Sequence, residues 1–278
     1  MLDANKNINN AGGRPHAPTG MQLQGPSMSD TIAIAGGSGG LGAAICRHLG
    51  SQGLHIVVGY HSRKAAAESV AQDIVAAGGS AVVCAVDLCD AKQVAAFLAQ
   101  SRSGERRLIG VVNATGPAIP LRPLSEISGD TFSAIMRTDV EGAFNLLTQA
   151  GALFAAAGGG SVVQLLTTAV LRTLENDAMS GIPKTAISGI VRQLARELGP
   201  QNVRFNGIAP GVIDAGIVHS SFTADPVAEG VINDCLAKTP MPRLGKPEEV
   251  SALAAFLLSD AAGYINGQII GIDGGYSA

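Results

Sequence analysis

Short apolar runs alternate along the chain with longer segments in which hydrophobic positions recur at helical spacing. From residue 31 onward, each short run is five to seven residues long, which is typical of strands that are covered on both faces. Strands that alternate with helices predict right-handed crossovers and a parallel sheet between two layers of helices. We therefore expect one three-layer α/β domain with a doubly wound sheet of about seven strands, at Thr31–Ala35, Leu54–Tyr60, Ser80–Val86, Leu108–Asn113, Ser161–Thr167, Val203–Ile208 and Gln268–Ile272.

The first of these strands runs through glycines directly into a segment with helical spacing. Gly36, Gly40 and Gly42 lie at this turn, with Ser38 and Leu41 between them. Without Cβ atoms, glycines permit a tight turn and let backbone N–H groups approach a pyrophosphate, while the N-terminus of the helix favours negative charge. The stretch predicts a phosphate-binding turn, and an ordinary tight connection between a strand and a helix is the alternative interpretation.

The composition narrows the class of protein. The 278 residues are 46% hydrophobic and 15% charged, with a mean hydropathy of +0.28, so the chain can bury one substantial core. The net charge is −3 and the basic residues are scattered, which gives no indication of nucleic-acid binding. No apolar run reaches about 18 residues, so we expect no membrane span.

The chain has four cysteines, and they form neither a C-x-x-C pair nor a zinc-binding spacing. Three of the four lie in apolar segments, where thiols commonly pack in the reduced form. We therefore expect a cytoplasmic protein without a metal site, in which Cys46, Cys84, Cys89 and Cys235 are free.

Residues 1–29 differ in composition from the rest of the chain. They are rich in Asn, Gly and Pro and show neither an apolar period nor the hydrophobic region of a secretory signal. They predict a flexible N-terminal extension ahead of a folded domain that spans residues 30–278.

Several motifs occur in an order that resembles the short-chain dehydrogenase/reductase family. The spacing of the first glycines, G-x3-G-x-G, resembles its cofactor loop, and Asn206–Gly211 resembles its N-x-x-x-P-G loop. Pro242–Glu249 is similar to the segment before its last helix, and Tyr264–Gly275 is similar to its C-terminal strand. The resemblance covers residues 31–276 and is closest to 3-oxoacyl-(acyl carrier protein) reductases. It implies a Rossmann-type fold, a nicotinamide dinucleotide cofactor and a substrate lid at about residues 214–240.

The residues after the second strand bear on which cofactor binds. Rossmann proteins that prefer NAD(H) usually have an acidic residue there, whereas this chain has His61, Ser62, Arg63 and Lys64. Arg63 could pair with the 2′-phosphate of NADP(H), which we therefore favour over NAD(H), although Arg63 and Lys64 would also suit the start of a solvated helix. The resemblance implies cofactor contacts from Gly36, Ser38, Gly40, Leu41, Gly42, His61, Ser62, Arg63, Asp87, Leu88, Asn113, Ala114, Gly116, Lys184, Pro210, Gly211 and Ile213.

The catalytic residues of the family are only partly matched. Lys184 matches the Lys that holds the nicotinamide ribose, but Ser180 stands four residues earlier, where the family has its proton-donating Tyr. Thr167, or Thr168 as a one-residue alternative, stands at the position of the Ser that orients the substrate carbonyl. Asp139 stands where the family has an Asn that anchors a water next to the Lys.

The exchange of Tyr for Ser weakens the expected chemistry. A phenol has a pKa near 10, whereas an aliphatic hydroxyl is several units weaker as an acid and the Ser180 side chain is shorter. General acid catalysis is worth roughly 10²- to 10⁴-fold, so reduction through Ser180 needs a proton from a water, Lys184 or a substrate group. If Asp139 lies near Lys184, as the resemblance implies, the two form an ion pair that serves either as acid and base or as inert scaffolding.

Three functions are compatible with these residues. The first is an NADP(H)-dependent reductase of a 3-oxoacyl thioester or similar ketone. The alternatives are a catalytically weak cofactor-binding subunit that pairs with an intact homologue, and a redox-neutral dehydratase, isomerase or cyclase. The expected partners are a small-molecule or carrier-bound acyl substrate and further chains, in a homodimer, homotetramer or hetero-oligomer built through the long helices from Gly129 and Ser180 and the C-terminal strand.

Overall fold

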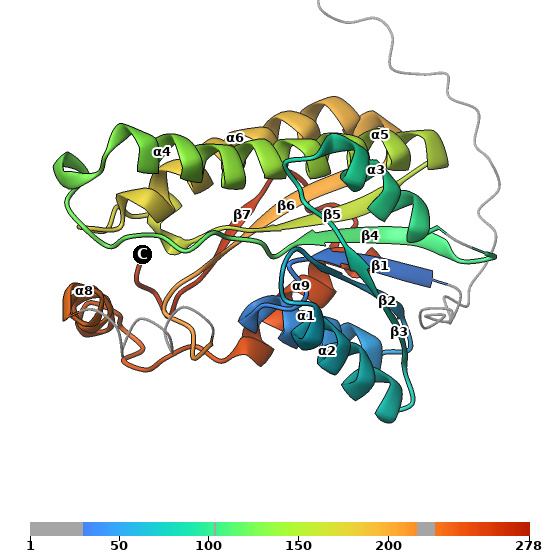
Figure 1. Ribbon diagram of the computed structural model, residues 1–278, viewed down its shortest axis with the longest axis horizontal. Coiled ribbons are helices and arrows are strands. Elements are labelled where there is room, and N and C mark those ends of the chain that lie inside the picture. Colours follow the sequence, from blue (N-terminus) through green and yellow to red (C-terminus); the bar gives the residue numbers. More distant parts are fainter. Residues whose placement is uncertain (1–29, 103, 216–225) are drawn as a thin grey trace, which may run out of the picture.

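Seven parallel strands form one sheet at the centre of the protein (Figure 1). The computed structural model describes residues 30–102, 104–215 and 226–278. The strand order is β3-β2-β1-β4-β5-β6-β7, so the chain reverses direction across the sheet between β1 and β4. The expected doubly wound α/β fold is confirmed. The predicted N-terminal extension, residues 1–29, lies outside the described residues. The strands are β1 (Asp30–Ala35), β2 (His55–Tyr60), β3 (Ser80–Ala85), β4 (Arg107–Asn113), β5 (Gly160–Leu165), β6 (Val203–Pro210) and β7 (Ile269–Ile272).

Helices cover both faces of the sheet and make the three predicted layers (Figure 1). One face carries α1 (Gly40–Ser51), α2 (Lys64–Ala76) and α9 (Pro247–Leu258), and the other carries α3 (Ala91–Gln100), α4 (Gly129–Met136), α5 (Gly142–Ala157) and α6 (Ala178–Leu198). Helix α8 (Pro226–Ala237) lies beside the C-terminal end of the chain, at the edge of the molecule. Within the described residues, no helix has the length and apolar character needed to cross a membrane.

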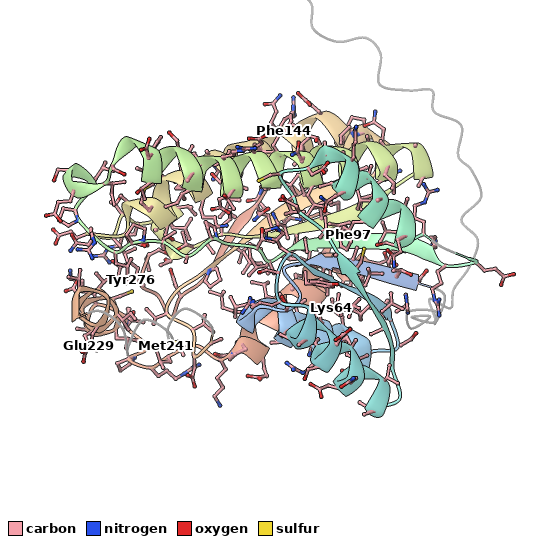
Figure 2. All side chains as sticks on the ribbon, in the orientation of Figure 1. Lys64, Phe97, Phe144, Glu229, Met241 and Tyr276 are labelled. Atoms are coloured by element: carbon pink, nitrogen blue, oxygen red, sulfur yellow. The ribbon has the colours of Figure 1, made fainter. Side chains whose placement is uncertain are left out.

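Each face of the sheet has its own apolar core, because successive side chains of a strand point to opposite faces. In β1, Ile32 and Ile34 pack toward α1 and α9, whereas Ala33 and Ala35 pack toward α5 and α6. Phe97 of α3 is fully buried in the second core and lies between its helix and the sheet (Figure 2). This double burial explains why the strands appear in the sequence as continuous apolar runs.

Two strands end two residues away from the predicted position, and the other bounds agree to within one residue. β5 ends at Leu165 rather than Thr167, because the chain turns into a short 3₁₀ helix at Thr168–Val170, in which the Thr167 hydroxyl accepts the N–H of Ala169. β6 continues to Pro210 rather than Ile208, because β7 runs alongside it and pairs Ile272 with Pro210. The first difference thus arises from a local turn, and the second from pairing with a distant segment of the chain.

Candidate active site

The turn between β1 and α1 forms a backbone cradle. Gly36 has a φ of +76°, and a Cβ at this position would lie 2.7 Å from the carbonyl oxygen of Ala114. A Cβ at Gly42 would lie 2.2 Å from the carbonyl oxygen of Gly36, so only glycine lets the helix pack this closely on the turn. Helix α1 begins after Gly39 without a hydrogen bond from a capping side chain. Its first N–H groups therefore suit a phosphate, which is the group that the glycine spacing predicts.

Arg63 extends toward this turn. Its Nη2 atom would lie 3.4 Å from a Cβ placed on Gly39, the residue that precedes α1. Lys64 starts α2 and instead forms a surface ion pair with Glu68, with Nζ 3.5 Å from Oε1 (Figure 2). Of the two neighbouring cations, Arg63 is thus the one placed beside the helix N-terminus that suits a phosphate.

The segment after β3 adds a carboxylate to the same end of the sheet. Asp87 accepts the backbone N–H of Cys89 on Oδ1 at 2.9 Å, and its Oδ2 lies 4.0 Å from Nε2 of His61. Leu88 is buried against α5, where Asn145 donates a hydrogen bond to its carbonyl oxygen at 2.9 Å. Asp87 and His61 consequently face each other across the ends of β3 and β2.

A hydrogen-bonded path connects the ends of β5 and β4 to Lys184. Asn113 is buried, donates to Oε1 of Gln164 at 2.9 Å, and accepts the hydroxyl of Thr115 at 2.7 Å. The carbonyl oxygen of Thr115 in turn accepts a hydrogen bond from Nζ of Lys184 at 3.1 Å. These contacts hold the end of β4 against α6. Asn113, which was predicted to contact the cofactor, thereby helps to fix the position of the segment that follows β4.

Asp139 and Lys184 form the buried ion pair that the resemblance implied. Nζ of Lys184 lies 2.7 Å from Oδ1 of Asp139, and the two side chains are only 10% and 3% exposed. Asp139 lies in a π-helical turn, Arg137–Glu141, that interrupts the long helix expected from Gly129 and separates α4 from α5. The wider turn carries one more residue than an α-helical turn, a feature that is frequent at functional sites.

The hydroxyls assigned to the catalytic positions have different surroundings. Thr168 is buried and donates to Oδ2 of Asp273 at 2.6 Å, whereas Thr167 is only half-buried and its Oγ1 accepts the N–H of Ala169 at 3.3 Å. Ser180 is half-buried near the start of α6, and its backbone N–H donates to the carbonyl oxygen of Asp177 at 3.1 Å. Thr167 is therefore the hydroxyl of the pair with more freedom to meet a substrate.

The segment after β6 lines a cavity together with Leu236 of α8. The N–H of Gly211 donates to the carbonyl oxygen of Ile272 at 3.1 Å, and Ile213 is buried. A cavity of about 320 Å³ lies beside this segment, lined among others by Ile213, Leu236, Met241 and Asp273. The predicted lid is described only in part, because residues 216–225 lie outside the described residues.

The structure thus brings the predicted cofactor residues to the carboxyl ends of the strands. The glycine turn lies close to Ala114, Arg63 lies beside Gly39, and Lys184 donates hydrogen bonds to both Asp139 and Thr115. The other residues that were predicted to contact the cofactor lie in the same segments. These are Ser38, Gly40 and Leu41 in the first turn, Ser62 after β2, Gly116 after β4 and Pro210 at the end of β6.

Sequence reasoning missed three polar residues of this region. Gln164 accepts a hydrogen bond from Asn113, Asp273 accepts the hydroxyl of Thr168, and the carbonyl oxygen of Asp177 accepts the backbone N–H of Ser180. Asp177 stands only three residues before Ser180, so its proximity was visible, but its burial depends on segments far away in the sequence. Among the described residues, no group of His, Cys, Asp and Glu is arranged to hold a metal ion.

Comparisons with known proteins find relatives over most of the chain. A family model described as enoyl-(acyl carrier protein) reductase matches residues 35–277. Versicolorin reductase 1 of Dothistroma septosporum is 29% identical over 262 residues, which cover 92% of this chain and 99% of that protein.

Solved structures show the same architecture. Levodione reductase superimposes with a TM-score of 0.83 at 26% identity, over 90% of this chain and 98% of that chain. A 7α-hydroxysteroid dehydrogenase complexed with NADH and 7-oxo glycochenodeoxycholic acid superimposes with a TM-score of 0.79 at 29% identity, over 88% of this chain and 93% of that chain. The chain therefore shares its fold with oxidoreductases over nearly its whole described length.

Proposed function

This chain belongs to the short-chain dehydrogenase/reductase family of oxidoreductases, and on that premise we propose that it is an NADP(H)-dependent ketone reductase. The proposed substrates are 3-oxoacyl thioesters or related ketones of the fatty-acid or polyketide type. Two relatives are named as reductases, and the 7α-hydroxysteroid dehydrogenase structure holds a 7-oxo compound beside NADH, which supports carbonyl chemistry.

The observation that carries the choice of cofactor is the position of Arg63 beside the N-terminus of α1. The glycine turn provides a cradle for a pyrophosphate, since a Cβ at Gly36 or Gly42 would fill it. The guanidinium next to Gly39 adds a fixed positive charge and a planar set of donors that match a second phosphate. Because NADP(H) differs from NAD(H) by its 2′-phosphate, the residues present fit NADP(H).

Lys184 and Thr167 have separate roles in this proposal. A Lys ammonium carries three N–H donors, and Lys184 directs two of them to Asp139 and to the carbonyl oxygen of Thr115. The third is available for a ribose hydroxyl, and Asp139 holds the ammonium in place for that contact. The hydroxyl of Thr167 orients the carbonyl oxygen of the substrate. When bound, the nicotinamide supplies a hydride to the carbonyl carbon.

The apolar face of α8 supports an acyl substrate. Ile232 is buried, Val231 and Leu236 are half-buried, and Leu236 lines the cavity beside the β6 segment. An aliphatic chain would gain about 25 cal/mol for each Å² of apolar surface that it buries against such a face. A charged substrate without an apolar part would gain nothing from it.

The proposal is tested by NADPH oxidation with a short 3-oxoacyl thioester. We expect the wild type to consume NADPH in step with alcohol formation, and Lys184→Ala to abolish this turnover. Ser180→Tyr restores the phenol of the family and should raise the rate. NADPH binding without turnover in the wild type would contradict the proposal, and product formed without NADPH consumption would indicate redox-neutral chemistry instead.

A second candidate is a cofactor-binding subunit with little activity of its own. The observation that favours it is Ser180, which is a far weaker acid than the Tyr that the family uses at this position. In that case the wild type would bind NADPH and remain inactive by itself, and turnover would appear only beside a homologue that has the Tyr. A gain of turnover in Ser180→Tyr alone would then show that both pockets are intact.

We also propose that the chain assembles with further copies of itself. Phe144 on α5 is 52% exposed and Phe256 on α9 is 41% exposed, and Phe144 lies on the outer surface of its layer (Figure 2). Large apolar side chains at such positions favour association. Light scattering should report a dimer or tetramer, and Phe144→Glu should shift it toward smaller species; a monomeric wild type would contradict the proposal.

A further inference from the structure

The turn after β5 that carries Thr167 is held by hydrogen bonds on both sides. Before it, the N–H of Leu166 donates to the carbonyl oxygen of Ile208 in β6 at 2.7 Å, and Leu166 is buried. After it, the hydroxyl of Thr168 donates to Oδ2 of Asp273 at 2.6 Å, and Thr168 is 3% exposed. Thr167 lies between these two buried residues and is itself half-buried. The position of its side chain therefore depends on both bonds.

The hydroxyl of Thr167 keeps its own donor. Its Oγ1 accepts the N–H of Ala169 at 3.3 Å, within the short 3₁₀ helix that begins at Thr168. A hydroxyl has one O–H donor and two acceptor sites, so this bond uses the oxygen and leaves the O–H able to donate. A carbonyl oxygen, the acceptor that the proposed function assigns to Thr167, is a group that such an O–H binds.

Asp273 stands directly after β7, 105 positions from Thr168, and is held in place by its own segment. Its Oδ1 accepts the N–H of Gly275 at 3.1 Å, and its Oδ2 accepts the N–H of Ser277 at 3.2 Å. Burial raises the pKa of this carboxyl, but hydrogen bonds from Ser277, Thr168 and Gly275 outweigh that effect and lower it. An ionised acceptor makes a hydrogen bond about twice as strong, so the bond from Thr168 is well suited to fix the turn.

A second contact joins the same two segments. Nη1 of Arg172 donates to the carbonyl oxygen of Tyr276 at 2.7 Å, and its guanidinium lies 4.9 Å from the centre of the Tyr276 ring. Tyr276 is buried, and its N–H donates to the carbonyl oxygen of Asp273 at 3.2 Å. The segment from Asp273 to Tyr276 thus contacts the chain after β5 at two points.

These contacts lie next to the proposed substrate region. Asp273 lines the cavity beside the β6 segment, together with Leu236 of α8. The N–H of Met241, which follows α8, donates to the carbonyl oxygen of Gly274 at 3.0 Å. Asp273 is therefore close to the substrate region, but its carboxylate is bonded to the turn after β5 and to its own segment.

We propose that Asp273 and Thr168 are positioning residues for the reduction, because their hydrogen bond sets the place from which the Thr167 hydroxyl binds the substrate carbonyl oxygen. This inference rests on the proposed function and assigns to it two residues that act through Thr167. A misplacement of about 1 Å costs on the order of 10²-fold in rate, since the reacting groups must be aligned. A carbonyl that is no longer oriented also presents either face to the hydride, so the alcohol loses stereochemical purity.

A first experiment examines the turn itself, without cofactor or substrate. Thr168→Val keeps the shape of the side chain but removes the donor, so hydrogen exchange of the Ala169 and Val170 amides should become roughly 10- to 100-fold faster. Thr168→Ser keeps the hydroxyl and should exchange at the wild-type rate. Thr31→Val is the matched control, because Thr31 is buried in β1 and its hydroxyl has no hydrogen-bond partner among the described residues. Equal exchange in the wild type and Thr168→Val would overturn the inference.

A second experiment measures the reaction. With NADPH and a short 3-oxoacyl thioester, Thr168→Val should lower kcat by roughly 10- to 100-fold and leave the Kd for NADPH unchanged. The 3-hydroxyacyl product of the wild type should be a single enantiomer, whereas that of Thr168→Val should contain both. Thr168→Ser should restore both kcat and enantiomeric purity. Asp273→Ala should lose at least as much as Thr168→Val, and the double variant no more than Asp273→Ala, because both changes remove the same bond.

The outcomes separate the positioning role from the proposed function. If Thr168→Val changes only the melting temperature and keeps a kcat within about twofold of the wild type with the same enantiomeric purity, the positioning role is overturned and the reductase remains. Absence of turnover in a wild type that binds NADPH overturns both. If Asp273→Ala does not fold, Thr168→Val and Thr168→Ser carry the test, since they differ in the hydroxyl that makes the bond.

Discussion

Lys184 donates a hydrogen bond across 2.7 Å to Asp139, and both side chains are removed from solvent. The pair joins α6 to the π-helical turn before α5, and its two residues are 45 positions apart in the sequence. A buried ammonium and a buried carboxylate each lose much of their hydration, and only their attraction and hydrogen bond offset that loss. Each of the two buried charges, on Lys184 and on Asp139, is therefore stabilised by the other.

The first prediction concerns this dependence. Asp139→Ala should lower the free energy of unfolding by about 3–5 kcal/mol, because it leaves the Lys184 charge buried without its partner. Asp139→Asn keeps an acceptor oxygen and should cost less. Urea denaturation of both variants checks this expectation, and a loss below about 1 kcal/mol in Asp139→Ala would show that the pair contributes little.

The second prediction concerns the choice of cofactor. Arg63→Ala should weaken NADPH binding by about 10- to 100-fold, since a charge-assisted hydrogen bond is worth about 1.5–3 kcal/mol, and should leave NADH binding nearly unchanged. Calorimetric titration with each cofactor measures the difference. Arg47→Ala is the matched control, because Arg47 lies on α1 and pairs with Asp73. Equal effects of Arg63→Ala on both cofactors would argue against a 2′-phosphate contact.

The third prediction concerns the glycine turn. Gly42→Ala should abolish NADPH binding and lower the free energy of unfolding by about 1–3 kcal/mol, because the new Cβ would lie 2.2 Å from the carbonyl oxygen of Gly36. Gly189→Ala, on α6, is the control. A Cβ at Gly189 would meet no atom within 4 Å, and alanine there should stabilise the helix by about 0.5–1 kcal/mol. Normal cofactor affinity in Gly42→Ala would disprove the cradle.

The fourth prediction concerns pH and stability. The folded chain holds the Asp177 proton up to about pH 7, whereas the unfolded chain releases it near pH 3.8, so stability falls as the pH rises through this window. The loss is at most on the order of 4 kcal/mol. Asp177→Asn cannot ionise, and its melting temperature should exceed that of the wild type more at pH 8 than at pH 5. A constant difference between the two proteins would place the pKa near its ordinary value.

Much of the fold is visible in the sequence because it depends on local patterns. Ile32 and Ile34 pack on one face of β1 while Ala33 packs on the other, and this double burial produces the apolar runs from which the sheet was predicted. The glycine turn is equally local, since the backbone conformation of Gly36 excludes most side chains whatever lies around it.

The site was only partly predictable, because its properties depend on contacts between distant segments. The spacing from Ser180 to Lys184 is a sequence feature, and the resemblance then indicated Asp139 as a neighbour. No local pattern distinguishes Arg63 from Lys64, yet in the folded chain Arg63 lies beside Gly39 and Lys64 pairs with Glu68. Likewise, the π-helical turn that holds Asp139 was expected to be an ordinary part of a long helix.

Asp177 shows most clearly the difference between what the sequence determines and what only the tertiary structure determines. Its place before α6 and its distance of three residues from Ser180 can be read from the chain. Its acidity cannot, because the pKa of a carboxyl depends on how much water the surrounding segments remove. The loop after β4, where Arg122 pairs with Asp177, lies against the start of α6 and helps to bury this carboxyl, and burial of this kind raises its pKa to about 7.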